Sequence, residues 1–433
     1  MKRIDKLSVL VVSWNGRRHL EACLPAILEQ RVPGVSVEVL VLDNGSTDGT
    51  SELLRRSFAG VTRVESTANV GFAAGNNRLA ERATGDALVL VNNDTRAEPG
   101  WLAALVDAAR SAPDDVAAVA GQIVDWPAER LDFGRGIVTF DGHALALDQG
   151  RPIDRARTPA AGEELLFGCG GNLLIRADSF RAAGGFDERF FAYFEDVDLG
   201  WRLWAAGERV VACPQAVVRH RLSATSARLE PFRRGAMFER NALFTMVKNL
   251  EPELRSALLP PVLLTFLARI EGTIGDAAAA RRLLRGAEGE PPPDSRESLG
   301  DKLRRLGAVG LVRRGGAKLA RSVADRLVPR PVPAQLEIGD PRALAQLSAL
   351  AGFLDELDGV EAERASLAAR RRRSDREIFD RFPLWIVPAY PGDERLFASP
   401  AFASWLPAGM RFERARLDEV IAPVDRAPIE ARG

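Results

Sequence analysis

The chain has 433 residues, which is too long for one small hydrophobic core and favours two or three domains. Its 59 basic and 59 acidic side chains balance, so no net positive charge would attract nucleic acid, and we expect no nucleic-acid partner. The three cysteines are scattered without a Cys-x-x-Cys spacing. This argues against a disulfide framework or a thiolate zinc site and favours a reducing, cytoplasmic compartment.

Segments typical of strands and helices alternate through the first part of the chain. Leu7–Ser13 is a continuous apolar run, as expected of a strand buried in a parallel sheet, and Asp5 before it argues against a signal peptide. Further strands are expected at Val37–Leu42, Val61–Glu65, Ala87–Val91 and Val116–Gly121. Helices are expected at Arg17–Gln30, after a cap at Thr47 or Asp48, at Ala73–Ala83, and at Gly100–Ser111 with Pro99 as the first residue. Repeated βαβ units predict an α/β fold with a mostly parallel sheet flanked by helices.

The regular alternation of expected strands and helices ends after Gly121. Residues 125–164 predict a loop-rich excursion. Regular structure is then expected at Leu165–Ile175, Glu195–Ala206 and near Arg209–Cys213. The remainder reads as largely helical, with linkers or helix stops at 291–293 and 329–333 and one strand-like piece at Leu384–Val387. The longest uncharged apolar stretch, Ser256–Ala268, is shorter than the about 20 residues of a membrane span, so we expect no transmembrane helix.

Polar side chains follow the first two expected strands at the points where these end. In open α/β sheets the carboxyl ends of parallel strands form the edge at which ligands bind, so we expect these side chains to contact a ligand. A carboxylate such as Asp43 can accept hydrogen bonds from a base or a ribose, and a local Asp-Asn-Gly-Ser turn is the alternative. The candidate binding residues are Ser13, Trp14, Asn15, Asp43, Asn44 and Ser46.

Two later segments are rich in amides. Asn69–Asn77 opens a helix with glycines, which permit close backbone approach, and amides, which bind uncharged polar groups; a capped helix N-terminus is the alternative. Its candidate binding residues are Asn69, Gly71, Phe72 and Asn76. In the second segment Asn92 and Asn93 are candidate ligand contacts. Asp94 after them can bind a divalent cation and leave coordination positions open for phosphate oxygens.

The cluster Glu195–Asp198 opens a helix between aromatic residues. Asp198 and Arg202 are four residues apart and predict an ion pair on one helix face, and negative charge in a first helical turn is favoured by the helix dipole. Aromatic neighbours partly desolvate a carboxylate, which raises its pKa and makes it a usable general base. We therefore expect the catalytic carboxylates to be Glu195 and Asp196, with Asp196 as the base.

His220 ends a strand-like segment and is one of three histidines. An imidazole at a strand end can bind a metal or contact a phosphate, and an ordinary surface histidine is the alternative. Ser223 and Ser226 follow it closely and add polar groups.

Taken in order, these motifs resemble those of glycosyltransferase family 2, and most closely its bacterial rhamnosyltransferase-like members. The resemblance covers the N-terminal part of the chain up to Phe238-Glu239-Arg240-Asn241. The matching segments are Ser8–Asn15, Val41–Asp48, Asn69–Asn77, Val91–Thr95, Gly168–Arg176, Gly184–Arg202 and His220–Ser226. The resemblance implies a GT-A fold, a nucleotide-sugar donor, a divalent metal (Mg²⁺ or Mn²⁺) and inversion at the anomeric carbon. The sequence departs from the family at Asn92, where many members have Asp, and the amide removes one negative charge.

The resemblance also implies residue roles. By position, Asp43 would contact the nucleotide base, Asp94 would bind the metal, and His220 would assist at the metal–diphosphate. Asp196 would take the proton from the acceptor hydroxyl. The expected reaction is a non-processive transfer of rhamnose or another hexose from a dTDP-, UDP- or GDP-sugar to a cell-surface glycan or a lipid-linked saccharide. A sugar nucleotidyltransferase and a non-catalytic nucleotide-sugar-binding module are the alternatives.

Three parts of the chain are expected on this basis. They are a GT-A catalytic domain over 1–228, a helical extension packed on it over 229–290, and a mostly helical region over 291–433. Leucines at near-helical spacing and an excess of Lys and Arg over 299–328 favour a basic amphipathic helix on the inner face of the cell membrane. An ordinary helix packed on the catalytic domain is the alternative, and the sequence indicates no oligomeric state.

Overall fold

A computed structural model describes residues 4–221, 231–273 and 341–422 of the chain. The chain divides into two compact units, the first comprising residues 1–270 and 342–433 and the second residues 271–341. Every contact discussed below lies within the first unit. None of the helices in the described ranges is long and apolar enough to cross a membrane.

Several expected features lie outside the described residues. They are the linkers at 291–293 and 329–333, the amphipathic helix at 299–328, and Ser223 and Ser226 after His220. The domain boundaries expected after residues 228 and 290 also lie outside the described ranges and stay a prediction.

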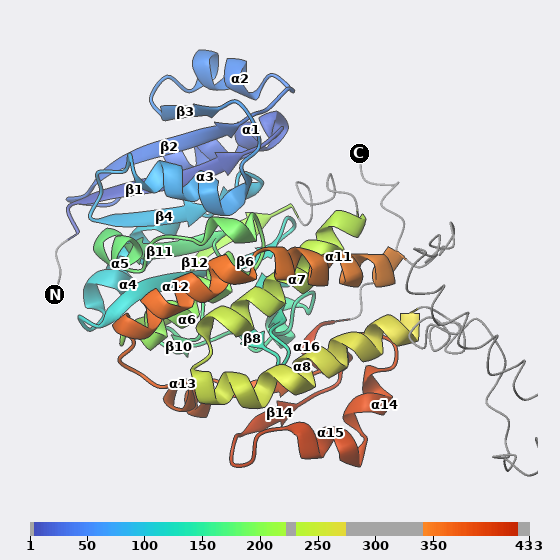
Figure 1. Ribbon diagram of the computed structural model, residues 1–433. Helices are drawn as coiled ribbons and strands as arrows, with labels where there is room; N and C mark the ends of the chain where they lie inside the picture. The colour runs from blue at the N-terminus through green and yellow to red at the C-terminus, as the bar shows by residue number, and fades with distance from the viewer. Residues whose placement is uncertain (1–3, 222–230, 274–340, 423–433) are drawn as a thin grey trace, which may run out of the picture. The chain divides into compact units, whose positions relative to one another are not determined.

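A ten-stranded sheet forms the centre of the first unit (Figure 1). Its strands are β1 (Lys6–Ser13), β2 (Ser36–Asn44), β3 (Thr62–Ser66), β4 (Ala87–Val91), β5 (Thr95–Ala97), β6 (Val116–Asp125), β7 (Leu131–Phe133), β10 (Glu164–Leu165), β11 (Asn172–Arg176) and β12 (Arg209–His220). The order is β10-β12-β6-β11-β4-β1-β2-β3, with β5 paired to β12 and β7 to β6. β1, β2, β3 and β4 run parallel, as do β6 and β12, while β11 runs antiparallel between β4 and β6. The expected mostly parallel sheet is confirmed.

The register of the parallel strands brings their polar ends to one edge. Ser13 at the end of β1 pairs with Asp43 near the end of β2. Leu10 of β1 pairs with Leu90 of β4, so the amides that follow β4 lie beside the end of β1. β12 is longer than expected and stays paired with β6 as far as His220, which faces Asp125. An irregularity between Cys213 and Val217 interrupts the β6–β12 register.

The helices up to residue 273 are α1 (Arg17–Leu28), α2 (Thr50–Ser57), α3 (Gly71–Ala80), α4 (Trp101–Ser111), α5 (Ala177–Ala182), α6 (Glu195–Ala205), α7 (Pro231–Asn249) and α8 (Pro252–Thr273), with short 3₁₀ turns η1 (Ile153–Arg155) and η2 (Glu188–Phe190). Of these, α1, α3, α4, α5 and α6 contact strands of the sheet, and α7 packs against α6. Two expected helix starts are wrong. Gly49, with φ of 86°, is the N-cap of α2, although Asp48 still accepts the N–H of Thr50. Gly100, with φ of 79°, is the N-cap of α4 and leaves Pro99 outside the helix, because a left-handed residue at the turn is accommodated by glycine.

The C-terminal part is largely helical, as expected. Its elements are α11 (Pro341–Asp355), α12 (Leu357–Arg370), α13 (Asp375–Arg381), β13 (Leu384–Ile386), α14 (Asp393–Phe397), α15 (Pro400–Trp405), β14 (Phe412–Arg414) and α16 (Leu417–Val420). The expectation of a single strand in this region is wrong, because β14 pairs in parallel with β13. Two strands of the 125–164 excursion, β8 (Gly136–Val138) and β9 (Ala144–Ala146), form a hairpin.

The excursion packs against the C-terminal part. Ile137 and Leu147 share a small buried core with Val387 and Val420. The backbone N–H of Phe140 donates to the carbonyl of Trp385 at 2.9 Å. The excursion and the C-terminal part therefore support each other, beside the edge of the sheet where the strand ends meet.

Candidate active site

A cavity of about 580 Å³ lies at the carboxyl ends of the parallel strands. Trp14 after β1, Asn44 at the end of β2 and the segment 92–94 after β4 line it, and so does His220 at the end of β12. Other lining residues come from the loop and first turn of α6 and from the excursion and the C-terminal part. This is the position in which open α/β sheets bind their ligands.

The expected donor contacts divide into two groups. Those that line the cavity are Trp14, Asn44, Asn69, Gly71, Phe72, Asn92 and Asn93. Those that do not line it are Ser13, Asn15, Asp43, Ser46 and Asn76. Asp43 accepts the N–H of Ser46 at 3.0 Å, and Asn76 donates to the carbonyl of Phe72 at 3.0 Å. For this second group the structure shows hydrogen bonds within the protein, and direct contact with a donor stays a prediction.

Two amides join neighbouring segments of the cavity edge. Asn44 Nδ2 donates to Asn69 Oδ1 at 3.0 Å and to the carbonyl of Gly71 at 3.1 Å, which connects the end of β2 to the start of α3. Asn93 Nδ2 donates to Ser13 Oγ at 3.0 Å, which connects the end of β4 to the end of β1. These contacts hold the strand ends in one arrangement without a ligand.

The candidate metal residues meet at the cavity. Oδ1 of Asp94 lies 3.2 Å from Nε2 of His220, and Nδ1 of His220 lies 2.7 Å from Oδ2 of Asp132. Burial lowers the pKa of His220, but the hydrogen bonds and charges of Asp132 and Asp94 outweigh burial and raise it to about 10. Burial raises the pKa of Asp94, but His220 holds it below its ordinary value. The structure therefore brings together two residues that are far apart in the sequence.

The sequence did not indicate Asp132, whose carboxylate contacts the ring nitrogen of His220 that does not face Asp94. Gln149 Nε2 donates to Oδ1 of Asp132 at 2.9 Å, so both oxygens of this carboxylate have partners. Asp132 lies 88 positions before His220, in the excursion. It reaches His220 because β7 pairs with β6 and β6 pairs with β12. No local motif marks it, because the contact depends on strand pairing.

The candidate catalytic carboxylates Glu195 and Asp196 begin α6 and both line the cavity. Asp196 Oδ2 accepts the N–H of Gly170 at 3.0 Å, and its Oδ1 accepts the N–H of Val197 at 2.9 Å. Oε2 of Glu195 is buried and has no hydrogen-bond partner among the described residues. Burial raises the pKa of both carboxyl groups, and the charge of Asp196 raises that of Glu195 further.

These pKa directions predict opposite pH trends for activity and stability. A base must be deprotonated, so kcat/KM should fall as the pH drops through the raised pKa of Asp196, above the ordinary aspartate value of 3.8. The folded protein holds these protons more tightly than the unfolded chain, so the contribution of the pair to stability should decrease as the pH rises through the same window. A pH–rate profile and urea unfolding at matched pH values measure both trends. An acid limb of kcat/KM at the ordinary aspartate pKa would contradict this prediction.

The loop before α6 has a strained backbone. Phe191, Tyr193 and Phe194 have φ values of 61°, 69° and 69°, in the left-handed region that bulky residues rarely adopt. Asn241 of α7 is buried, and its Nδ2 donates to three carbonyls of this loop. The acceptors are Phe190, Ala192 and Tyr193, at 3.0, 2.9 and 2.8 Å. Asn241 is the last residue of the segment Phe238-Glu239-Arg240-Asn241, where the family resemblance ends. Its contact with the loop could not be predicted from the sequence.

The same loop contacts the start of α3. The carbonyl of Phe191 accepts the N–H of Phe72 at 2.6 Å and that of Ala73 at 3.1 Å. A Cβ atom at Gly71, which has φ of 88°, would lie 2.5 Å from this carbonyl oxygen. Only glycine permits this approach. The loop therefore fixes the first turn of α6, with its two carboxylates, against the amide-rich segment.

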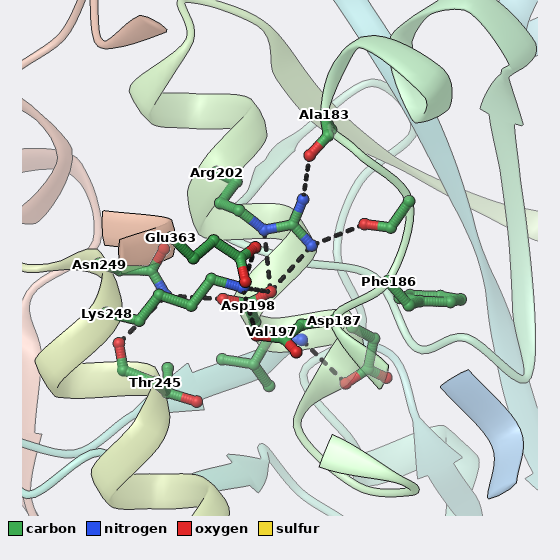
Figure 2. Close-up of polar contacts among 12 residues, drawn as sticks. Ala183, Phe186, Asp187, Val197, Asp198, Arg202, Thr245, Lys248, Asn249 and Glu363 are labelled. Atoms are coloured by element: carbon green, nitrogen blue, oxygen red, sulfur yellow. Dashed lines mark hydrogen bonds and ion pairs between the residues drawn. The ribbon is translucent and has the colours of Figure 1, made fainter. Parts of the chain in front are cut away.

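Figure 2 shows a buried polar cluster behind the first turn of α6. Asp198 Oδ2 lies 2.8 Å from Nη2 of Arg202, so the expected intrahelical pair is confirmed. Lys248 of α7 is fully buried, and its Nζ lies 3.1 Å from Asp198 Oδ2. The same Nζ lies 2.8 Å from Asp187 and 3.0 Å from Glu363 of α12. The cluster ties α6, α7 and α12 together.

Comparison with known proteins gives four similarities. The family model of glycosyl transferase family 2 matches residues 8–184. N-acetylglucosaminyl-diphospho-decaprenol L-rhamnosyltransferase of Mycobacterium tuberculosis is 33% identical over 246 residues, 52% of this chain and 78% of that protein. O-antigen biosynthesis protein RfbC of Myxococcus xanthus is 31% identical over 230 residues, 51% of this chain and 18% of that protein. The crystal structure of GalNAc-T7 with UDP, GalNAc and Mn²⁺ has a TM-score of 0.47 and 15% identity, and the match covers 60% of this chain and 52% of that chain.

The family match falls on a part of the chain that supplies many of the residues lining the cavity. The match over residues 8–184 includes β1 to β4 and the metal candidate Asp94. The sheet and its flanking helices have the architecture that the resemblance implied. The chain therefore belongs to glycosyltransferase family 2, and it is a glycosyltransferase of GT-A fold close to the rhamnosyltransferase-like members.

Proposed function

We propose that this glycosyltransferase is a metal-dependent, inverting and non-processive enzyme. It moves a hexose, with rhamnose as the first candidate, from a dTDP-, UDP- or GDP-sugar to a hydroxyl of a lipid-linked or cell-surface saccharide. The observation that carries the proposal is that the base candidate Asp196 and the Asp94–His220 pair line one cavity. The mycobacterial relative, named an N-acetylglucosaminyl-diphospho-decaprenol L-rhamnosyltransferase, supports the choice of sugar and acceptor.

The Asp94–His220 pair would hold a divalent cation once the cation displaces the proton that His220 carries beside Asp94 and Asp132. Asp94 Oδ1 and His220 Nε2 lie 3.2 Å apart at the cavity, so a single ion could contact both atoms. The contact with Asp132 directs Nε2 towards Asp94, as carboxylates behind metal-binding histidines do. In the described ranges no group of three or more His, Cys, Asp or Glu side chains is placed to hold a metal. We therefore assign two protein ligands, Asp94 and His220, and the donor diphosphate would complete the coordination.

The residues of the cavity account for the transfer. Asp196 takes the proton of the acceptor hydroxyl, and the N–H groups of Gly170 and Val197 hold its two oxygens in position. The acceptor oxygen bonds to the anomeric carbon while the bond to the diphosphate breaks on the opposite face, so one displacement inverts the configuration. When bound, the divalent ion supplies charge stabilisation of the leaving diphosphate, an effect of several kcal/mol.

Metal-dependent nucleotide binding is the first expected result. UDP, dTDP or GDP should raise the melting temperature in Mn²⁺ or Mg²⁺ and much less in EDTA, because Asp94 and His220 would hold an ion whose charge would offset that of the diphosphate. A ligand at 100 times its Kd adds about 2.7 kcal/mol of stability. The Asp94→Asn variant should lose the metal-dependent part of the shift. Asp107→Asn, an exposed substitution of the same type on α4, should not.

Two outcomes of this thermal-shift experiment would count against the proposal. One is a nucleotide shift that is the same with EDTA as with metal. The other is an Asp94→Asn shift equal to that of the wild type. A transfer assay with the sugar of the stabilising nucleotide then identifies the donor, and NMR of the product linkage tests inversion.

A further inference from the structure

A second cleft of about 490 Å³ lies beside the cavity of the active site. We propose that it binds an anionic group, a phosphate or a carboxylate, carried by the acceptor saccharide. This identification of the ligand as the acceptor rests on the proposed function. The residues that line the cleft, here called the arginine cleft, are Asp148, Arg151, Arg155, Arg157, Trp385, Glu413, Arg414, Ala415 and Glu419.

Two backbone segments separate the arginine cleft from the active-site cavity. Asp148 lines the cleft, and the next residue, Gln149, lines the cavity. On the second segment Glu419 lines the cleft and Ile421 lines the cavity. Gln149 and Ile421 form a parallel bridge, and the N–H of Asp148 donates to the carbonyl of Val420 at 2.6 Å. The active-site cavity and the arginine cleft therefore lie on either side of this pair of segments.

Two guanidinium groups are held in place in the cleft before any ligand binds. Asp148 is buried, and its Oδ1 lies 2.7 Å from Nε of Arg151 and 2.7 Å from Nη2 of Arg157. Arg151 also donates to the carbonyls of Asp418 and Glu419, at 2.9 and 3.0 Å. One carboxylate therefore orients two cations and neutralises only one charge. Side chains that are already ordered lose less entropy when a ligand binds.

Two further cations in the cleft lack a carboxylate partner. Within the described ranges, Arg155 makes no side-chain hydrogen bond or ion pair, and Arg414 donates only to the carbonyl of Phe397, at 3.2 Å. The other acidic residues of the cleft have their own cations, because Glu413 pairs with Arg411 and Glu419 with Arg416. The cleft therefore has positive charge available to an incoming anion.

The chemistry of these side chains indicates the ligand class. The planar guanidinium group matches the paired oxygens of a phosphate or carboxylate, and such charge-assisted hydrogen bonds are among the stronger ones in proteins. Trp385 adds an aromatic surface beside the arginines, suited to the apolar face of a sugar ring. An anionic saccharide satisfies both features, whereas a neutral sugar would leave the unpaired cations without a partner.

Ligand-observed NMR titration of the full chain tests this proposal. The probes are N-acetylglucosamine 1-phosphate, glucuronic acid and neutral N-acetylglucosamine, in EDTA so that no metal captures phosphate in the active-site cavity. We expect the charged probes to bind more tightly than the neutral one and to weaken with salt. The double variant Arg155→Ala with Arg414→Ala should lower affinity for the charged probes about 10- to 100-fold. Both side chains are exposed, so the variant should fold.

The matched control is Arg56→Ala with Arg63→Ala, which removes the same charge from exposed positions on α2 and β3. It should bind the probes as the wild type does. Charged probes that bind no better than the neutral sugar, or equally well to the arginine-cleft double variant, would overturn the proposal. Comparison of the affinities for N-acetylglucosamine 1-phosphate and glucuronic acid shows whether the cleft prefers a phosphate or a carboxylate. Nucleotide thermal shifts in the same proteins distinguish the two proposals. A missing metal-dependent shift in the wild type counts against the proposed function and the identification of the ligand as the acceptor, but not against anion binding in the arginine cleft.

Discussion

The Asp196→Asn variant is expected to lose transfer activity by about 10²- to 10⁴-fold, the usual contribution of a general base. The amide has the size of the carboxylate but cannot accept a proton from the acceptor hydroxyl. Because Asp196 is proposed to act on the acceptor, the metal-dependent thermal shift with nucleotide should persist. Initial rates of transfer, measured with the donor identified from the nucleotide panel, give the loss directly.

Glu195→Gln is the matched control for this variant. It removes the neighbouring carboxylate of the same turn, whose Oε2 is buried without a hydrogen-bond partner among the described residues. We expect a much smaller loss of kcat than for Asp196→Asn. A larger loss in Glu195→Gln would transfer the role of base to Glu195. Unchanged turnover in both variants would show that neither carboxylate is the base, and a wild type that binds nucleotide without any turnover would favour a non-catalytic module.

The Lys248→Met variant is expected to lower the free energy of unfolding by about 3–5 kcal/mol, the usual cost of removing one partner from a buried ionic cluster. Lys248 is fully buried and contacts Asp187, Asp198 and Glu363 (Figure 2). Methionine fills a similar volume but leaves three carboxylates to share Arg189 and Arg202. Urea unfolding monitored by circular dichroism measures the change.

Lys6→Met serves as the control for Lys248→Met. Lys6 is partly exposed and pairs with Glu38 at 3.2 Å, so its loss should cost about 0–1 kcal/mol, as for other surface pairs. Adding Glu363→Gln to Lys248→Met should recover part of the lost stability, because one carboxylate without a full partner is removed. An equal loss in the two single lysine variants, or no recovery in the double variant, would contradict the role assigned to the cluster.

Local features of the site were predictable because they depend on neighbours in the chain. The ion pair between Asp198 and Arg202 follows from their spacing on one helical turn. The apolar run of β1 and the polar residues after it follow from the burial of a parallel strand and its exposed end. Such patterns are weaker at helix starts, where Gly49 replaced the expected cap of α2 and Gly100 excluded Pro99 from α4, and for short strands such as β14, which was missed.

Contacts between distant segments were not predictable in this way. Asp132 meets His220 only because β7, β6 and β12 are paired, and Asn241 meets the strained loop only because α7 packs beside α6. The arginine cleft likewise joins the excursion to the C-terminal part. No single arginine of the cleft indicates a binding site in the sequence, because an arginine whose spatial neighbours are unknown is interpreted as an ordinary surface charge.

The sequence by itself determined the alternation of strands and helices over residues 7–121, the family resemblance and the residues at the ends of those strands. Hydrophobic periodicity and turn residues act over a few positions, and these are the distances that a single sequence reports. The tertiary structure alone decided which of those residues line the same cavity and that Asp132 contacts Nδ1 of His220. It also decided that Lys248 connects α6 to α12. These outcomes depend on strand pairing and helix packing across long stretches of chain, where burial and charge neutralisation select the partner.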